Sequence, residues 1–405
     1  MTKAHAPAVG ESVALLALLT SLIALAIDAV LPALPQIGHS LAVEDPNQLQ
    51  WIIGALFFGL SIGQIIYGPL SDSYGRKPSI YLGLVIFIIG TLVSAFAQSF
   101  EVMLLGRVIQ GIGASGPKVV SIALVRDQYK GAEMARIMSF IMAVFILVPA
   151  LAPSFGYLIL TVSGWREIFF SFLALSGISL IWFGSRQPET LPAEKRIPFT
   201  LGRILAGTKE TVSNKTVRRS MLAAGMIFGA FISYLSTVQP LFQDIFAITD
   251  QFPLYFALLA LSIGCASLLN SRLVTRLGME RISVMSLQAV IGLSILFTPL
   301  LIATDGKPPL LLFMLYMAAT FLCIGMLFGN LNAMAMNPMG HIAGIAAAVI
   351  GSGTTLISVV IGGAIGQLYN GTLFPLTFAF ALLSLVAYLL IRHMAREKIK
   401  PKAEA

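Results

Sequence analysis

Long apolar segments alternate with short polar ones along the whole chain. Twelve segments of about 20 residues are almost free of charge, and an α-helix of that length crosses the hydrocarbon core of a bilayer. Strands of a membrane barrel would alternate apolar and polar residues over about ten positions, which these segments do not do. The pattern predicts an all-α polytopic membrane protein whose helices lie near residues 12–35, 48–70, 79–97, 101–124, 134–160, 165–184, 220–242, 252–272, 281–303, 309–332, 342–369 and 372–391.

The composition agrees and narrows the functions open to the chain. Only 11% of the residues are charged and 57% are hydrophobic, whereas soluble domains carry about 25% charged residues. Cys265 and Cys323 each fall inside a predicted helix, and with four histidines the chain offers few ligands for a metal. There is no H-E-x-x-H sequence and no nucleophile elbow, so we expect neither an enzyme nor a bound cofactor.

Basic residues concentrate in alternate loops. The net charge is +8, and loops rich in Lys and Arg mark the cytoplasmic side of a membrane. The other loops carry mostly acids, among them Glu44, Asp45, Glu101 and Asp305. We therefore expect both termini to be cytoplasmic and no nucleic-acid partner. The basic loops contain Arg76, Lys77, Arg126, Lys130, Arg136, Arg186, the 195–219 segment, Arg272, Arg276 and Arg281.

The longest polar stretch, residues 185–219, divides the predicted helices into two groups of six. We expect a first six-helix half at residues 1–185, a cytoplasmic basic linker at 186–218 and a second half at 219–405. The halves carry related loops in equivalent places, GPLSDSYGRKPS at 68–79 and NSRLVTRLGMER at 270–281. Internal repeats of this kind are typical of secondary transporters.

Several separated motifs resemble those of the major facilitator superfamily. The loop signature is Gly68-x-x-x-Asp72-x-x-Gly75-Arg76-Lys77, and the fourth helix has Arg107-x-x-Gln110-Gly111-x-Gly113-Ala114, similar to the superfamily's drug exporters. The fifth helix has Pro149-Ala-Leu-Ala-Pro153-x-x-Gly156, which resembles the antiporter motif. Asp28-x-x-Leu31-Pro32-x-Leu34-Pro35, the Val125-Arg126-Asp127 step and Gly340-His341-x-Ala343-Gly344 are similar to the Bcr/CflA group of bicyclomycin and chloramphenicol exporters. Ser73 departs from the loop signature, which usually has a basic residue there.

The resemblance implies the major facilitator fold, with two pseudo-symmetric halves and alternating access across a bacterial inner membrane. It also implies a conformational latch made by Gly68, Asp72, Gly75, Arg76, Lys77 and Arg126. Asp72 would meet a helix N-terminus or Arg126, and the basic residues would hold the loop at the anionic inner surface. The alternative is an ordinary positively charged loop that only sets the topology of the chain in the membrane.

A single acid, Asp28, lies inside the first apolar segment. A charge there costs about 2.5–3.5 kcal/mol on insertion scales, so it should face a cavity and have a partner. Arg107 is the best candidate, since both residues lie about 10 Å below the outer ends of their helices. Burial favours the neutral acid and a nearby arginine favours the carboxylate, so a change of state would load or release a proton. We expect Asp28 and Arg107 to couple transport to protons; a permanent structural ion pair is the alternative.

Candidates for the substrate pocket come from the inner helices of each half. Methionine and aromatic side chains suit apolar ligands of varied shape. Lys118 lies eleven residues after Arg107 and therefore on nearly the same helix face, so that two cations and one acid favour neutral or anionic amphiphiles. Alternatively, each candidate side chain serves only to pack the helices together. For Lys118, the alternative is that its long side chain extends to the inner membrane surface. The candidates are Lys118, Met142, Phe145, Tyr234, Asn330 and Asn332.

These features predict a monomeric, proton-driven exporter of small amphipathic drugs, with the substrate, protons and the lipid bilayer as its partners. A proton-coupled carrier of an endogenous metabolite, working as an exporter or a nutrient symporter, is the alternative. The antiporter-like motif with Pro149, Pro153 and Gly156 argues against the symporter.

The predicted topology is open to a labelling test. Cysteines placed at residues 44 and 305 are expected to react with a membrane-impermeant reagent outside the cell, because both positions lie in acidic loops. Cysteines at residues 77 and 205 are expected to stay unlabelled. Labelling of position 205 from outside would contradict the arrangement.

Overall fold

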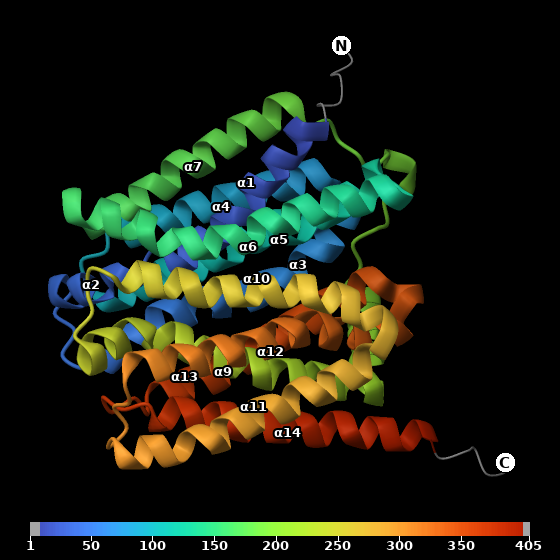
Figure 1. The fold of residues 1–405 in the computed structure, drawn as a ribbon. Helices are drawn as coiled ribbons and strands as arrows, with labels where there is room; N and C mark the ends of the chain where they lie inside the picture. The colour runs from blue at the N-terminus through green and yellow to red at the C-terminus, as the bar shows by residue number, and fades with distance from the viewer. Residues whose placement is uncertain (1–8, 400–405) are drawn as a thin grey trace. The chain divides into compact units, whose positions relative to one another are not determined.

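The structure, a computed structural model, describes residues 9–399; the side chains at 9, 132, 135, 139, 142, 145, 146 and 395–399 lie outside the description. All regular elements of the described residues are helices (Figure 1). In chain order they are α1 (Val9–Asp28), η1 (Leu31–Ala33), α2 (Leu34–Ser40), η2 (Pro46–Gln50), α3 (Trp51–Tyr74), α4 (Arg76–Ala95), α5 (Phe100–Gln128), α6 (Gly131–Val162), α7 (Trp165–Arg186), η3 (Ala193–Lys195), α8 (Leu201–Ser213), α9 (Lys215–Phe246), α10 (Phe252–Leu277), α11 (Met279–Ala303), α12 (Leu310–Met336), η4 (Asn337–Ile342), α13 (Ala343–Gly366) and α14 (Phe374–Ile399).

Twelve of these helices correspond to the predicted spans. Ten stretches are long and apolar enough to cross a membrane, and one of them, Leu310–Gly366, contains both α12 and α13. α6 is the twelfth, with a shorter apolar part at Leu147–Val162. Within the described residues, the prediction of an all-α membrane protein with twelve long helices is confirmed.

The first predicted span is not continuous. α1 ends at Asp28 and is followed by the 3-10 turn η1 and the short helix α2. Pro32 and Pro35 lack the N–H groups that would extend the hydrogen-bond ladder, which disfavours a regular helix through this segment. The last turn of α1 therefore keeps backbone carbonyls without helical donors, directly beside the acid.

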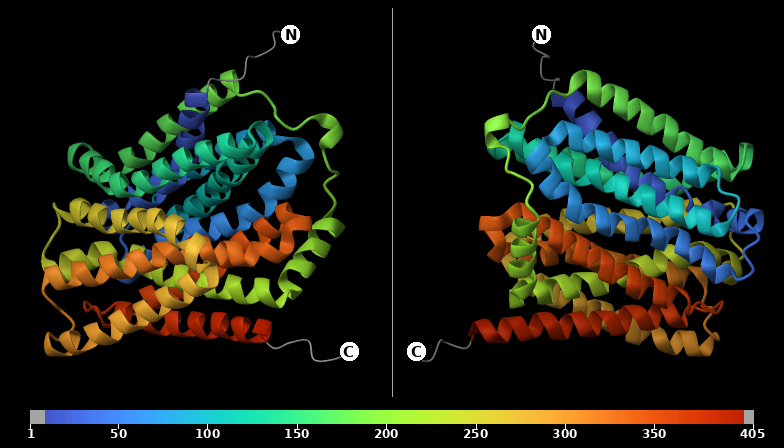
Figure 2. Two further views of the ribbon diagram at one scale, coloured as in Figure 1. Left: turned by 45° about the vertical axis from the view of Figure 1, so that its right-hand side comes forward. Right: turned by 180° about the vertical axis from the view of Figure 1, so that it is seen from behind.

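The chain divides into two units, residues 1–205 and 206–405. The boundary falls inside the stretch where we expected the linker, which holds η3 and α8. In the first unit α1 and α3 to α7 lie side by side, and in the second α9 to α14 do so (Figure 2). After α7 the chain passes over the end of α3, where the N–H of Ile197 donates to the Asp72 carbonyl at 3.0 Å.

α5 packs closely against both α3 and α4 in the first unit. Its small residues let the backbones touch. A Cβ on Gly111 would collide with the Leu56 carbonyl of α3, and a Cβ on Gly113 with the Phe87 backbone of α4. Small residues at helix crossings are a common basis of close packing in membranes. α5 is thus fixed on two sides, and with it the backbone at Arg107 and Lys118.

A Gly111→Ala variant is expected to unfold at a lower temperature in detergent, because its added methyl group has no space against the Leu56 carbonyl. Overpacking of this kind costs about 1–3 kcal/mol. Gly177 of α7 is the matched control, since nothing lies within 4 Å of its Cβ position. There alanine favours the helix by about 1 kcal/mol. Equal unfolding temperatures for Gly111→Ala and Gly177→Ala would contradict this account of the packing.

Candidate functional site

Asp28 is the last residue of α1 and is buried, with 5% of its surface exposed. Its carboxylate makes no hydrogen bond or ion pair with the part of the chain that the structure describes. The hydroxyls of Thr20 and Ser21 donate to carbonyls of their own helix, at 3.0 and 2.6 Å, and so do not reach the acid. An acid in a span without a partner is a candidate functional group.

The helix that carries the antiporter-like motif packs directly on this end of α1. A Cβ on Gly156 of α6 would collide with the carbonyl of Ala29, so the two backbones touch at the residue after Asp28. Pro149 and Pro153 lie within α6, where each removes one helical N–H. A shift of α6 would therefore act directly on the broken end of α1.

Arg107 of α5 is fully buried and makes three hydrogen bonds. Its guanidinium donates to the Ala26 carbonyl at 2.7 Å, the Ile52 carbonyl at 3.2 Å and the Gln110 side chain at 2.6 Å. Gln110 in turn donates to Thr91 of α4 at 2.8 Å. The arginine thus joins α1, α3 and α5, and its donors are directed at neutral acceptors.

The predicted ion pair between Asp28 and Arg107 does not form in this structure. The reason is the break in α1, which leaves the Ala26 carbonyl without a helical donor and makes it an acceptor for Arg107. Spacing along the sequence could not reveal this, because it places the two residues at similar depth without saying which oxygen the guanidinium meets. The coupling role of both residues stays a prediction.

Lys118 follows Pro117 in the interior of α5 and is partly buried. Pro117 itself is buried against α4, where a Cβ on Gly83 would meet its ring. The Lys118 ammonium makes no hydrogen bond or ion pair with any described residue. After Asp28, it is the second charge in the apolar part of this unit for which the described residues provide no partner.

The other candidates for the substrate pocket differ in burial and in the residues that they contact. Tyr234 is fully buried in an aromatic cluster, with its ring centroid 4.8 Å from that of Phe321. Asn330 is buried and exchanges two hydrogen bonds with Asn270, at 2.8 and 3.3 Å, whereas Asn332 is exposed. The side chains of Met142 and Phe145 lie outside the described residues. A role of these five residues in binding stays a prediction.

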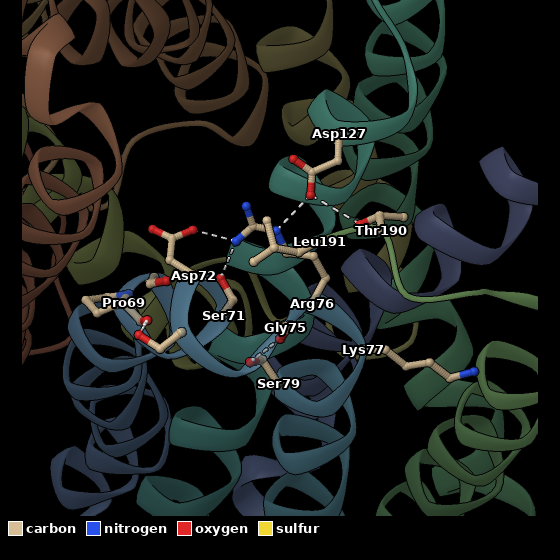
Figure 3. A network of polar contacts seen from close by, with 12 residues as sticks. Pro69, Ser71, Asp72, Gly75, Arg76, Lys77, Ser79, Asp127, Thr190 and Leu191 are labelled. Carbon is tan, nitrogen blue, oxygen red and sulfur yellow. Dashed lines mark hydrogen bonds and ion pairs between the residues drawn. The ribbon is translucent and has the colours of Figure 1, made fainter. Parts of the chain in front are cut away.

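Arg76 holds the loop between α3 and α4 (Figure 3). Its guanidinium donates to Asp72 at 2.6 Å, to the Ser71 hydroxyl at 2.9 Å and to Asp127 of α5 at 2.9 Å. The Ser71 hydroxyl itself donates to the Gly68 carbonyl at 3.0 Å. Charge-assisted bonds of this kind are the strong ones, and Arg76 is buried, which limits their screening by salt. The arginine thereby connects the ends of α3 and α5.

The predicted contact of Asp72 with Arg126 does not form. Arg126 is exposed, and the next residue, Asp127, takes part in the contact through Arg76. Neighbouring residues of a helix point about 100° apart, so only one of this pair can face the loop. The loop and the end of α5 are joined as expected, but with the charges exchanged between the partners.

A third acid, Glu189, caps α4. Gly75 precedes this helix with a φ of 109°, in the region that favours glycine. The Glu189 carboxylate accepts hydrogen bonds from the N–H groups of Arg76 and Lys77, both at 3.0 Å. An anion there meets unpaired N–H groups and the positive end of the helix dipole. Lys77 points away from Arg76 and donates to the Gly184 carbonyl of α7 at 2.8 Å.

Asp127 and Glu189 are the residues that the sequence interpretation left out of the latch. Asp127 adjoins Arg126 in a quoted motif, and Glu189 is an acid at the start of a basic linker. The hydroxyl of Thr190 donates to Asp127 at 3.2 Å, so the start of the linker is bound to the same network. The predicted linker also contains Glu194 and Glu210, so the sequence did not single out Glu189.

Comparison with known proteins gives one family. The model of the Major Facilitator Superfamily matches residues 16–363. The bicyclomycin resistance protein homolog of Haemophilus influenzae is 30% identical over 382 residues, 92% of this chain and 94% of that protein. The uncharacterised MFS-type transporter YdgK of Bacillus subtilis is 29% identical over 371 residues, 89% and 90% of the two chains. The fold is similar to that of the human organic anion transporter MFSD10, with a TM-score of 0.73 at 19% identity over 95% of this chain and 99% of that one. The resemblance inferred from the motifs is confirmed.

Neutralising Arg76 is expected to disturb the loop more than neutralising Arg126. Arg76→Gln leaves Asp72 and Asp127 without their shared cation, which should lower the free energy of unfolding by about 1–3 kcal/mol and reduce transport. Arg126→Gln changes an exposed side chain and should stay within about 0.5 kcal/mol of the wild type. Thermal unfolding in detergent and a transport assay measure both effects. A larger effect of Arg126→Gln than of Arg76→Gln would contradict this account and favour the predicted pairing of Asp72 with Arg126.

Proposed function

Since the chain belongs to the Major Facilitator Superfamily, we propose that it exports small amphipathic compounds in exchange for protons. The family and the relatives described above are transporters, and the chain is a multi-pass membrane protein. Antiport, the drug-like substrate, both termini on the cytoplasmic side of a bacterial inner membrane and the absence of a cofactor are parts of this proposal.

One observation carries the proposal: a buried acid in a spanning segment without a partner among the described residues. A charge at such a position costs about 2.5–3.5 kcal/mol, and protonation removes that cost. A proton moving inward gains about 2.3 kcal/mol per 100 mV of membrane potential. A pH difference adds about 1.4 kcal/mol per unit. The gradient is therefore large enough to load and unload Asp28 in each cycle.

The neighbours of Asp28 suggest how its proton would be tied to movement. In this structure Arg107 bonds to the Ala26 carbonyl, two residues before the acid. Once Asp28 loses its proton, the carboxylate competes with that carbonyl for the guanidinium, because a charged acceptor forms the stronger hydrogen bond. Rearrangement of the last turn of α1 would act on α6 through the contact of Ala29 with Gly156.

Two features support export. The stretch of α6 on which this movement would act, from Pro149 to Gly156, resembles the motif of antiporters. A relative with 30% identity over 92% of this chain is described as a bicyclomycin resistance protein homolog. A substrate that binds more tightly when Asp28 is deprotonated would leave as the proton enters.

Asp28→Asn is expected to abolish export driven by a pH gradient, because an amide cannot take up or release the proton. Binding of a neutral compound such as chloramphenicol should survive, since the substitution keeps the size of the side chain. Glu44→Gln, which neutralises an exposed acid in a loop, is the control and should transport like the wild type. Transport into inverted vesicles measures the rates. Asp28→Asn working at the wild-type rate under a pH gradient would rule out this coupling.

A further inference from the structure

The spanning helices carry an uneven set of charges. Three charged residues lie inside apolar spans with uncharged residues on both sides: Asp28, which ends α1 but lies within the span Gly10–Ser40, and Arg107 and Lys118 of α5. The other charged residues of the long helices lie toward the helix ends. With Asp28 ionised the interior carries one excess positive charge, and with Asp28 protonated it carries two. No further acid in either unit's apolar segments offsets them.

The two cations differ in what they can still bind. Arg107 is fully buried and donates to the Ala26 and Ile52 carbonyls and to Gln110. Lys118 is partly exposed and has no partner among the described side chains. Arg107 is therefore engaged by the protein, whereas Lys118 can receive a ligand.

The position of Lys118 along α5 keeps its charge within an apolar environment. Residues 119–125 carry no charge and separate it from Arg126 by about 12 Å of helix. The preceding Pro117 is packed against Gly83 of α4, which fixes the backbone there. A cation in such surroundings gains most from an anion placed beside it, because charges interact more strongly where the dielectric constant is low.

We propose that Lys118 binds an anionic group of the substrate, so that the preferred compounds are amphiphilic monoanions. This inference rests on the proposed export function and names its substrate class. Eleven residues, about 16 Å of helix, separate Lys118 from Arg107, which contacts the turn beside Asp28. An anion at Lys118 therefore leaves Asp28 able to exchange its proton. A lipophilic monocation would add to the positive charge and bind poorly.

The binding test compares two probes that differ in one charge. Chloramphenicol hemisuccinate is a monoanion, and its methyl ester is neutral with nearly the same shape. Wild-type protein in detergent is expected to bind the hemisuccinate about tenfold more tightly, the size of one charge-assisted interaction of about 1.4 kcal/mol. Lys118→Met should remove this preference by weakening the anion alone, and Lys118→Arg should keep it. Lys209→Met, at an exposed lysine of α8, is the matched control and should behave as the wild type.

Three results of the binding test would overturn the inference. The wild type could bind both probes equally, or it could bind neither. Lys118→Met could also retain the preference for the anion. Unfolding temperatures of the variants show whether each one is folded, and the unchanged affinity for the methyl ester gives a second check.

A transport test separates this inference from the proposed antiport. Exchange of one proton for a monoanion moves two charges, and exchange for a neutral compound moves one. At constant pH, an increase of about 60 mV in membrane potential should raise the concentration ratio about hundredfold for the hemisuccinate and about tenfold for the ester. If the concentration ratio of the hemisuccinate does not change with the membrane potential, the anion and the proton move in the same direction. That result would contradict antiport, while the assignment of Lys118 is decided by binding, which needs no gradient.

Discussion

A charge inside a bilayer must find its partner in the protein, in the substrate or in a proton, because the hydrocarbon offers none. Three charges of this chain face that constraint in the interior of its spans, and they meet it differently. Arg107 is met by two backbone carbonyls and an amide. Asp28 and Lys118 have no partner among the described residues. We assign the proton to Asp28 and an anionic substrate to Lys118.

The surrounding fold supports this division of roles. α5 is held against α3 and α4 by backbone contacts at Gly111 and Gly113, so Arg107 and Lys118 stand on a rigid helix. Asp28 lies instead where α1 is broken before Pro32, in contact with a helix that contains two prolines. The two cations therefore lie on a closely packed helix, and the acid lies at a break in another. At the other end of α5, Arg76 and Glu189 join the loop, α4, α5 and the start of the linker through charge-assisted bonds.

The sequence was sufficient for the fold, but it did not reveal which residues pair with one another, and it left Asp127 and Glu189 out of the latch. Apolar segments of spanning length determine how many helices there are, since the bilayer leaves few other solutions. The partners of Arg107 could not be inferred, because the carbonyl of Ala26 becomes an acceptor only once α1 ends at Asp28. Whether Arg126 or Asp127 faces the loop depends on the rotation of α5 about its axis, because neighbouring residues point about 100° apart. The sequence does not determine that rotation. Glu189 accepts from the N–H of Arg76, more than a hundred residues earlier in the chain, and spacing carries no information across such a separation.

The central claim is that Asp28 carries the transported proton, and proton release on ligand binding tests it most directly. The methyl ester of chloramphenicol hemisuccinate is added to the detergent-solubilised protein in weakly buffered solution. A pH-sensitive dye measures the number of protons released. The wild type is expected to release up to one proton per bound ligand, and Asp28→Asn is expected to bind the ligand without release. Equal release from Asp28→Asn, or binding to the wild type with no release at any pH, would contradict it.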